Sequence, residues 1–125
     1  MASSVIKPGI LVGLQELEPS SPFFKEGQSV RVTGKLESYN VESAMAVIVD
    51  GGASLLIDTQ NLRDICFRTN SIYQFIGELL IPQDGQVTLK ARVGRNVDGI
   101  DLNLYHQSIQ LRRKFEAHIA KSKTT

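Results

Sequence analysis

The side chains able to do acid–base or nucleophilic chemistry are few in this sequence of 125 residues. Its two histidines, His106 and His118, lie twelve positions apart in a segment of helical periodicity, so they do not share one helix face. Its single cysteine, Cys66, has apolar neighbours, and we expect a buried small side chain rather than a nucleophile. Because a base, a nucleophile and an orienting group cannot be assembled, the sequence predicts that the protein is not an enzyme.

The sequence also lacks the motifs that hold metals, nucleotides or other cofactors. No His-x-x-x-His or Cys-x-x-Cys pair is present to bind zinc. The glycines at positions 51, 52, 94 and 99 suit turns and bends, and none belongs to a phosphate-binding motif. We therefore expect neither a metal nor a cofactor.

Basic side chains are the remaining candidates, and their chemistry would be the neutralisation of phosphate groups. They fall on two predicted strands, and a tyrosine in a predicted loop could stack on a base. The candidates for nucleic-acid contact are Arg31, Lys35, Tyr39, Lys90, Arg92 and Arg95. Each one taken singly has the alternative of being an ordinary solvated side chain, so the prediction rests on their grouping.

Composition and charge indicate one ordinary globular domain that is not a polycation. The chain is 42% hydrophobic and 22% charged, with a formal net charge of +1. Residues 112–125 carry +4 and residues 1–111 carry −3, so nucleic acid would meet a local patch. No apolar run is long enough to span a membrane, and we expect no secretory signal. A lone cysteine suits a reducing compartment, which predicts a nuclear or cytosolic protein.

The element that organises the rest of the chain is a long hairpin over residues 71–101. Two apolar runs flank the sequence Pro-Gln-Asp-Gly, in which Asp84-Gly85 supplies the reversal. The first run has apolar residues on both faces, which predicts a strand covered at least partly on each side. The second run alternates apolar with polar and basic residues, which predicts one buried and one basic face. The side chains expected on that buried face are Val87, Leu89, Ala91 and Val93.

Upstream of the hairpin, the pattern predicts an arm, three strands and a short helix. The strands are expected at 27–38, 44–50 and 53–58, with a loop at 39–43 and a helix at 59–64. Gly34 is expected to bend the first strand, so that this strand belongs to both sides of a small closed barrel. Residues 1–26 contain closely spaced prolines, so we expect an arm with a helical turn at 14–17, pinned by Phe23 and Phe24.

Five predicted strands, with a short helix between the third and fourth, indicate a small β-barrel. We expect an OB-fold, the five-stranded Greek-key barrel, with a C-terminal α-helix; an SH3-like small barrel is the competing architecture. The expected division is an N-terminal arm at 1–26, the barrel at 27–99, a partner-binding helix at 100–120 and a basic tail at 121–125.

The C-terminal helix carries two separate apolar stripes. One contains Leu102, Tyr105 and Ile109. The other, nearly opposite, contains Leu104, Leu111, Phe115 and Ile119. Because one stripe can lie on the barrel, the second predicts a helix-on-helix interface with another subunit. The alternative is that the N-terminal arm covers the second stripe.

Four runs of residues, in order, resemble a known family. They are S-V-R-V-T-G-K-L from Ser29, N-S-I-Y-Q-F-I-G-E-L from Asn70, L-K-A-R-V from Leu89 and V-D-G-I-D-L-N-L-Y from Val97. These runs are similar to the smallest subunit of the telomere-capping CST complex, the Ten-one family, over about residues 27–115. None of the runs is a catalytic signature.

The resemblance implies a non-enzymatic OB-fold subunit that pairs with the STN subunit and joins the large CTC subunit. That assembly binds single-stranded telomeric DNA in the nucleus, protects chromosome ends and helps polymerase α-primase fill in the complementary strand. The resemblance places Leu104, Leu111 and Phe115 against the partner helix, and Arg31 and Lys35 along the DNA path. The alternative is a stand-alone module that binds single-stranded nucleic acid.

Overall fold

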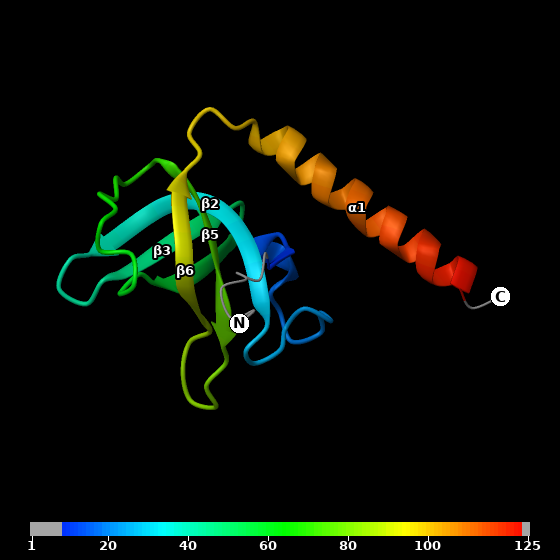
Figure 1. The fold of residues 1–125 in the computed structure, drawn as a ribbon, viewed down its shortest axis with the longest axis horizontal. Coiled ribbons are helices and arrows are strands. Elements are labelled where there is room, and N and C mark those ends of the chain that lie inside the picture. The colour runs from blue at the N-terminus through cyan, green and yellow to red at the C-terminus, as the bar shows by residue number, and fades with distance from the viewer. Residues whose placement is uncertain (1–8, 124–125) are drawn as a thin grey trace, which may run out of the picture.

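The structure is a computed structural model that describes the backbone of residues 9–123 and the side chains of residues 9–120. A β-barrel is followed by a single long helix that begins at one end of the barrel and projects away from it (Figure 1). The elements are β1 (Ile10–Leu11), the 3₁₀ helix η2 (Leu14–Glu16), β2 (Ser29–Asn40), β3 (Met45–Asp50), β4 (Ala53–Asp58), β5 (Ile72–Leu80), β6 (Thr88–Asn96) and α1 (Leu102–Lys123).

The strand order confirms the predicted five-stranded Greek-key barrel. Hydrogen-bonded neighbours run β2-β3-β4-β6-β5, and β5 pairs again with β2, which closes the barrel. The contact between β4 and β6 is parallel, whereas the other barrel pairings are antiparallel. The short strand β1 was not predicted, and it adds to the edge of β2 in parallel.

Strand β2 bends as predicted and pairs with two strands, β3 and β5. Lys35 is opposite Val49 of β3 and also opposite Ile72 of β5, so the strand changes partner at this point. A Cβ atom on Gly34 would lie 3.0 Å from the Val49 carbonyl oxygen, so glycine permits the close approach of β3. A bulge follows between Leu36 and Ser38, and it lets the strand continue to Asn40, beyond the predicted end at residue 38.

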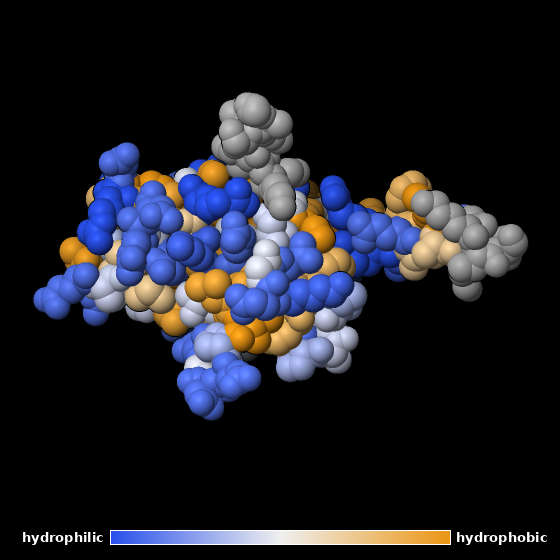
Figure 2. All heavy atoms as spheres, turned by 60° about the horizontal axis from the view of Figure 1, so that its bottom comes forward, coloured by the Kyte–Doolittle hydropathy of each residue, from blue (hydrophilic) through white to orange (hydrophobic). Residues whose placement is uncertain are grey.

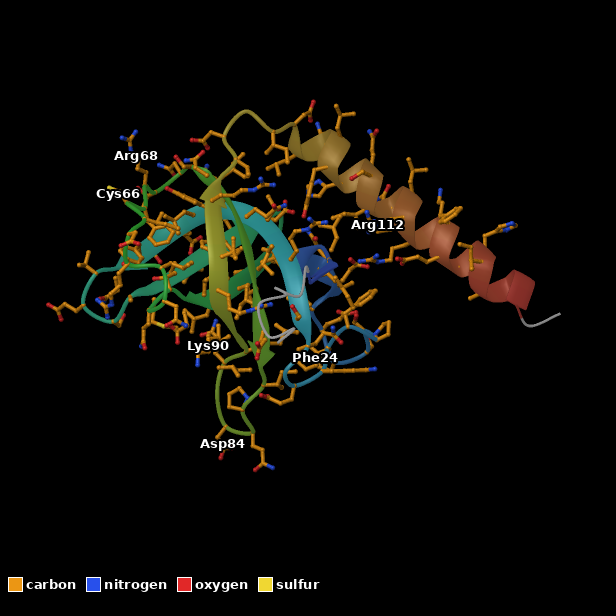
Figure 3. All side chains as sticks on the ribbon, in the orientation of Figure 1. Phe24, Cys66, Arg68, Asp84, Lys90 and Arg112 are labelled. Atoms are coloured by element: carbon orange, nitrogen blue, oxygen red, sulfur yellow. The ribbon has the colours of Figure 1, made fainter. Side chains whose placement is uncertain are left out.

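The long hairpin is confirmed, with one correction to its inner face. Leu89 and Ala91 are buried as predicted. A bulge in β6 separates the pairs Gly77 with Ala91 and Ile76 with Val93, so the alternation of side chains reverses there. Val93 is therefore half-buried on the outer face, contrary to the prediction, and Gly94 takes the inner position against Phe75. The loop between the strands spans residues 81–87, with Asp84 at its tip (Figure 3).

The segment between β4 and β5 corrects two further predictions. No helix forms at 59–64; isolated turns appear instead, with Leu62 N–H donating to the Thr59 carbonyl at 2.8 Å. The Thr59 hydroxyl and N–H both donate to the Ala44 carbonyl, which holds the chain against the β2–β3 loop rather than in a helix. Cys66 is exposed, not buried, because its neighbours Ile65 and Phe67 pack against the core.

The arm and the helix follow their predicted patterns closely. The helical turn expected at 14–17 is η2, and Phe23 packs against the barrel core. The described arm begins at residue 9, so the predicted arm at 1–8 lies outside the described residues. Asp101 accepts hydrogen bonds from the Asn103 N–H at 2.9 Å and the Leu104 N–H at 3.2 Å, which makes it the N-cap of α1. The helix runs to Lys123, past the predicted end at residue 120.

Candidate partner-binding and nucleic-acid-binding surfaces

Helix α1 has one docked face and one apolar face that is exposed among the described residues. Ile109, in the first stripe, is 6% exposed and packs toward the barrel, while Tyr105 and Leu102 are half-buried. The second stripe is exposed: Leu104 by 62%, Leu111 by 66%, Phe115 by 64% and Ile119 by 37%. Hydrophobic atoms are visible on the projecting part of the helix in Figure 2. We call Leu104, Leu111, Phe115 and Ile119 the apolar stripe.

The described part of the arm, residues 9–26, contacts the opposite side of α1. Arg113 lies about half a turn from the apolar stripe, and it makes hydrogen bonds and a ring contact to the arm. The arm therefore supports the docked face and leaves the apolar stripe exposed. This arrangement favours the predicted interface with another subunit over coverage by the described arm.

Arg113 makes several contacts that we call the arm clamp. Its Nε donates to Glu16 Oε2 at 2.7 Å, and its Nη2 donates to Glu16 Oε1 at 2.9 Å. Nη2 also donates to the backbone carbonyl of Leu11. The guanidinium carbon lies 4.4 Å from the centroid of the Phe23 ring, in the geometry of a cation–π contact.

The arm clamp shifts the pKa of both charged partners. Burial alone would raise the pKa of Glu16, but the hydrogen bonds from Arg113 and the Gly13 N–H, with the Arg113 charge, outweigh burial and lower it. The hydrogen bond to Glu16 raises the pKa of Arg113, although burial opposes the rise. Both groups are therefore charged at neutral pH.

A second polar contact, which we call the barrel clamp, joins α1 to the end of β3. His106 Nε2 lies 2.6 Å from Asp50 Oδ2, and the Asp50 side chain is only 5% exposed. Gln15 of η2 donates to the Asp50 backbone carbonyl at 2.9 Å. A buried carboxylate is costly without a partner, so His106 has a structural reason to lie here.

Neither clamp was predicted. Glu16 and Arg113 are 97 positions apart, and Asp50 and His106 are 56 apart. Local periodicity compares residues within a few turns or strand steps, so it carries no information about such pairs. Arg113 was counted only as part of the C-terminal positive charge.

Five of the six predicted nucleic-acid contacts gather on one outer face of the barrel, formed by β2, β5 and β6. Across these strands, Thr33 lies opposite Gln74 and Gln74 lies opposite Arg95, while Glu78 lies opposite Lys90. Arg95 Nη2 donates to Gln74 Oε1 at 2.9 Å. We call this surface the basic face, and it contains Arg31, Lys35, Lys90, Arg92 and Arg95.

The basic face borders the side that an OB barrel commonly uses, because Lys35 lies opposite Val49 of β3 and Lys90 lies opposite Asp58 of β4. The common ligand surface of an OB barrel is the face of its second and third strands, which are β3 and β4 in this protein. In β3 and β4 the outward side chains include the half-buried aliphatic residues Val47, Val49 and Leu56. Lys90 lies near the start of β6, beside the lower end of that strand in Figure 3.

Within the basic face, the five side chains differ in accessibility. Lys35, Lys90 and Arg95 are exposed. Arg92 is half-buried; its Nη2 donates to Ser29 Oγ at 2.9 Å and its Nε lies 3.8 Å from Glu78 Oε1. Arg31 is half-buried beside α1, and Arg31 Nε has no hydrogen-bond partner among the described residues. Burial raises the pKa of the Tyr105 phenol, and the nearby Arg31 charge counteracts this only in part.

Tyr39 does not join the basic face. The structure places it in β2, opposite Ala46, so its predicted position in the first loop is wrong. Its ring centroid is 4.9 Å from that of Phe67, and the side chain packs against the core. One side of the ring is thus already used within the protein, which leaves at most the other for a base.

The described residues contain no group of three or more histidine, cysteine or acidic side chains placed to hold a metal ion. In the same part of the chain, no helix has the length and apolar character needed to cross a membrane. Cys66 and Arg68 lie at the end of the barrel remote from the projecting helix (Figure 3).

The strand order and the unpartnered helix face define an OB-fold barrel protein with a C-terminal helix. Over residues 5–119 the sequence matches the family described as a telomere-capping CST complex subunit, Ten1. The chain is 60% identical to the CST complex subunit TEN1 of Arabidopsis thaliana, over 92% of this chain and 91% of that protein. The chain therefore belongs to the Ten1 family of telomere-capping CST complex subunits.

A more distant relative and two solved structures agree with this assignment. The chain is 28% identical to the CST complex subunit TEN1 of Homo sapiens, over 79% of this chain and 84% of that protein. It aligns with a chain of the S. pombe Stn1–Ten1 complex at a TM-score of 0.68 and 25% identity, covering 86% of this chain and 94% of that one. The S. pombe telomere capping protein Ten1 gives a TM-score of 0.67 at 25% identity, covering 85% and 98%.

Proposed function

We propose that this chain is a non-enzymatic subunit that pairs with an Stn1-type OB-fold subunit through the apolar stripe of α1. The observation that carries the proposal is the exposure of Leu111 and Phe115, each about two-thirds accessible, on a helix whose other face is docked. Support also comes from the S. pombe complex, in which a similar fold is part of an Stn1–Ten1 assembly.

The physical argument is the burial of apolar surface. Fully burying a Leu, Ile or Phe side chain that was exposed is worth roughly 1.5–3 kcal/mol. The spacing of seven, four and four positions from Leu104 to Ile119 keeps all four side chains on one strip of the helix. Such a strip suits a helix that lies against the apolar face of another helix or in a groove.

Membership of the family supports a proposal for the wider assembly. With its Stn1-type partner the chain joins the large CTC subunit and acts at telomeres in the nucleus. The pair contributes to holding single-stranded telomeric DNA, and through the complex it supports fill-in of the complementary strand by polymerase α-primase. The basic face supports a direct, weak contact with the DNA, because its exposed cations can neutralise phosphates.

The test is a double substitution on the apolar stripe, Leu104→Asp with Leu111→Asp. Two buried, unpaired carboxylates at the interface should abolish co-purification with the Stn1-type subunit, because desolvating them costs more than the contact returns. The β-sheet circular dichroism signal should be unchanged, since both side chains are exposed in the free chain. Val41→Asp is the control, because Val41 is 74% exposed in the β2–β3 loop, away from α1.

Retention of equimolar partner by the double variant would contradict the proposal. Loss of the β-sheet signal together with binding would show that the face is core rather than interface.

The second candidate is a stand-alone module that binds single-stranded nucleic acid. The observation that favours it is the gathering of five basic side chains on one face of the barrel. This function predicts tight DNA binding by the isolated chain, whereas the subunit function predicts weak binding until the partner is present. Fluorescence anisotropy with a labelled telomeric oligonucleotide, with and without the Stn1-type subunit, separates the two.

A further inference from the structure

We propose that Arg113 and His106 are positioning residues that fix the orientation in which α1 presents its apolar stripe, an inference that rests on the function proposed for that stripe. Neither residue lies on the stripe: at about 100° per residue, both are roughly opposite it on the helix. They act on the partner only through the direction in which they hold the helix.

The docked face of α1 has little apolar contact of its own. Among the described side chains of the helix, residues 102–120, only Ile109 is buried. An open groove of about 760 Å³ lies between η2 and α1, and Gly13 and Ile109 are among the residues that line it. Ile109 and the half-buried Leu102 and Tyr105, beside an open groove, do not fix the rotation of a helix, because apolar contacts are not directional.

The two clamps supply the missing directional contacts. The barrel clamp holds the helix at His106, with Nε2 2.6 Å from a buried carboxylate. The arm clamp holds it two turns further on, where Arg113 donates to both carboxylate oxygens of Glu16 and stacks on Phe23. Bidentate arginine–carboxylate contacts constrain orientation as well as distance. Two fixed points on one side of a helix define both its tilt and its rotation.

The projecting helix turns a small change in direction into a large displacement. From His106 to Ile119 the helix extends roughly 20 Å at 1.5 Å per residue, so a tilt of about 10° would move the far end by roughly 3 Å. Such a shift is enough to misalign Phe115 and Ile119 with a rigid partner surface. Holding the helix before the encounter therefore lowers the ordering cost of binding.

The experiment measures helix orientation and partner affinity in the same variants. Spin labels are placed at Ala117→Cys on the projecting helix and Ser54→Cys on β4, in a Cys66→Ser background of the full chain. We expect a narrow distance distribution by pulsed electron spin resonance for the parent protein. Arg113→Gln, Glu16→Gln and His106→Gln should each broaden it. Arg112→Gln is the matched control, since it removes the same charge one position away, and Arg112 makes none of the contacts of either clamp.

The variants that broaden the distance distribution should also bind the recombinant Stn1-type subunit more weakly, and the Arg112→Gln control should bind it as the parent does. If loss of the arm clamp leaves the helix correctly oriented about one tenth of the time, the dissociation constant rises about tenfold. The Glu16→Gln substitution is on the arm and leaves the sequence of α1 intact. It should weaken binding in the same direction as Arg113→Gln but by less, because Arg113 keeps its contacts with the Leu11 carbonyl and the Phe23 ring. A variant with both Glu16→Gln and Arg113→Gln should bind no more weakly than Arg113→Gln alone, because Arg113→Gln already removes every contact of the arm clamp. Adding the partner should narrow the broadened distance distribution again.

Several outcomes would overturn the inference. The inference is wrong if the spin-label distance distribution is unchanged in the Glu16 and Arg113 variants. It is also wrong if that distribution broadens while the dissociation constant for the partner stays the same. Additive losses in the double variant would show that Arg113 contacts the partner directly. Full affinity in the Leu104→Asp, Leu111→Asp variant would instead reject the proposed function of the stripe, whatever the clamp variants do.

Discussion

At the scale of single residues, glycine 77 shows how closely the barrel strands approach one another. A Cβ atom built on Gly77 would lie 2.2 Å from the Lys90 carbonyl oxygen and 2.8 Å from the Ala91 Cα. These atoms are backbone of β6 at the bulge, so they cannot move aside as the end of a flexible side chain would. The absence of a side chain at this position is therefore a condition for closing the barrel.

Gly77→Ala should destabilise the fold by about 2–3 kcal/mol, because the added methyl group must displace the backbone of β6. Gly52→Ala is the matched control; a Cβ there meets no atom within 4 Å, so its effect should stay within about 0.5 kcal/mol. Urea unfolding followed by circular dichroism measures both. Equal midpoints for the two variants would mean that the bulge relaxes without cost.

At the scale of elements, the N-terminal arm works as a support for the C-terminal helix. Strand β1 attaches the arm to β2, and η2 presents Glu16 to Arg113 on one side and Gln15 to the end of β3 on the other. At the start of the helix, Asp98 accepts the Ile72 N–H at 2.7 Å, which ties the β6–α1 linker to β5. That backbone hydrogen bond lowers the pKa of Asp98. The direction of α1 thus depends on elements from both ends of the chain.

The arm clamp predicts an acid-dependent loss of stability. Folding lowers the pKa of Glu16 from its ordinary value of 4.5. The charged Glu16 therefore contributes fully to the free energy of unfolding above pH 4.5, and this contribution is lost as the pH falls through the pKa of the folded state. The difference in unfolding free energy between the parent chain and Glu16→Gln should be largest near neutral pH and should shrink below about pH 4.5. Urea unfolding from pH 7 to pH 3 measures this.

Glu42→Gln is the control for the acid series, because Glu42 lies exposed in the β2–β3 loop. Its unfolding curve should follow the parent at every pH. A constant difference between the parent and Glu16→Gln across the series would contradict the role assigned to the Glu16 charge.

At the scale of the whole molecule, the protein separates two candidate surfaces. The apolar stripe lies on a helix that projects from the barrel, whereas the basic face lies on the barrel itself (Figure 1). A partner subunit held by the helix would leave the exposed cations of β2 and β6 accessible. The two contacts can therefore be disrupted independently.

Lys35→Ala with Lys90→Ala should weaken binding of single-stranded telomeric DNA by the heterodimer without changing partner affinity. Each lost phosphate contact should reduce the slope of log affinity against log salt by about 0.7, so the double variant should lose about 1.4. Arg63→Ala is the control, since Arg63 is exposed in the β4–β5 segment, outside the basic face. Titrations at several salt concentrations measure the slope, and an unchanged slope would place the DNA path elsewhere.

Much of the fold was predictable because its signals are local. The alternation in β2 and in the first part of β6, and the turn at Gly51-Gly52, predicted those strands and the hairpin of β3 and β4. The errors lie where tertiary contacts override local preference. The bulge in β6 turned Val93 outward, the packing of Phe67 left Cys66 exposed, and the contacts of Thr59 replaced the expected helix with turns.

Strand alternation and helical spacing are properties of neighbouring residues, and they predicted the barrel strands and the second apolar stripe on α1, while an SH3-like barrel remained the competing architecture. What α1 rests on, and the direction in which its apolar stripe points, depend instead on long-range contacts. The contacts that settle this join Glu16 to Arg113 and Asp50 to His106, and they form between residues 97 and 56 positions apart. Such pairs exist only once the barrel has closed and brought β3, the arm and α1 together.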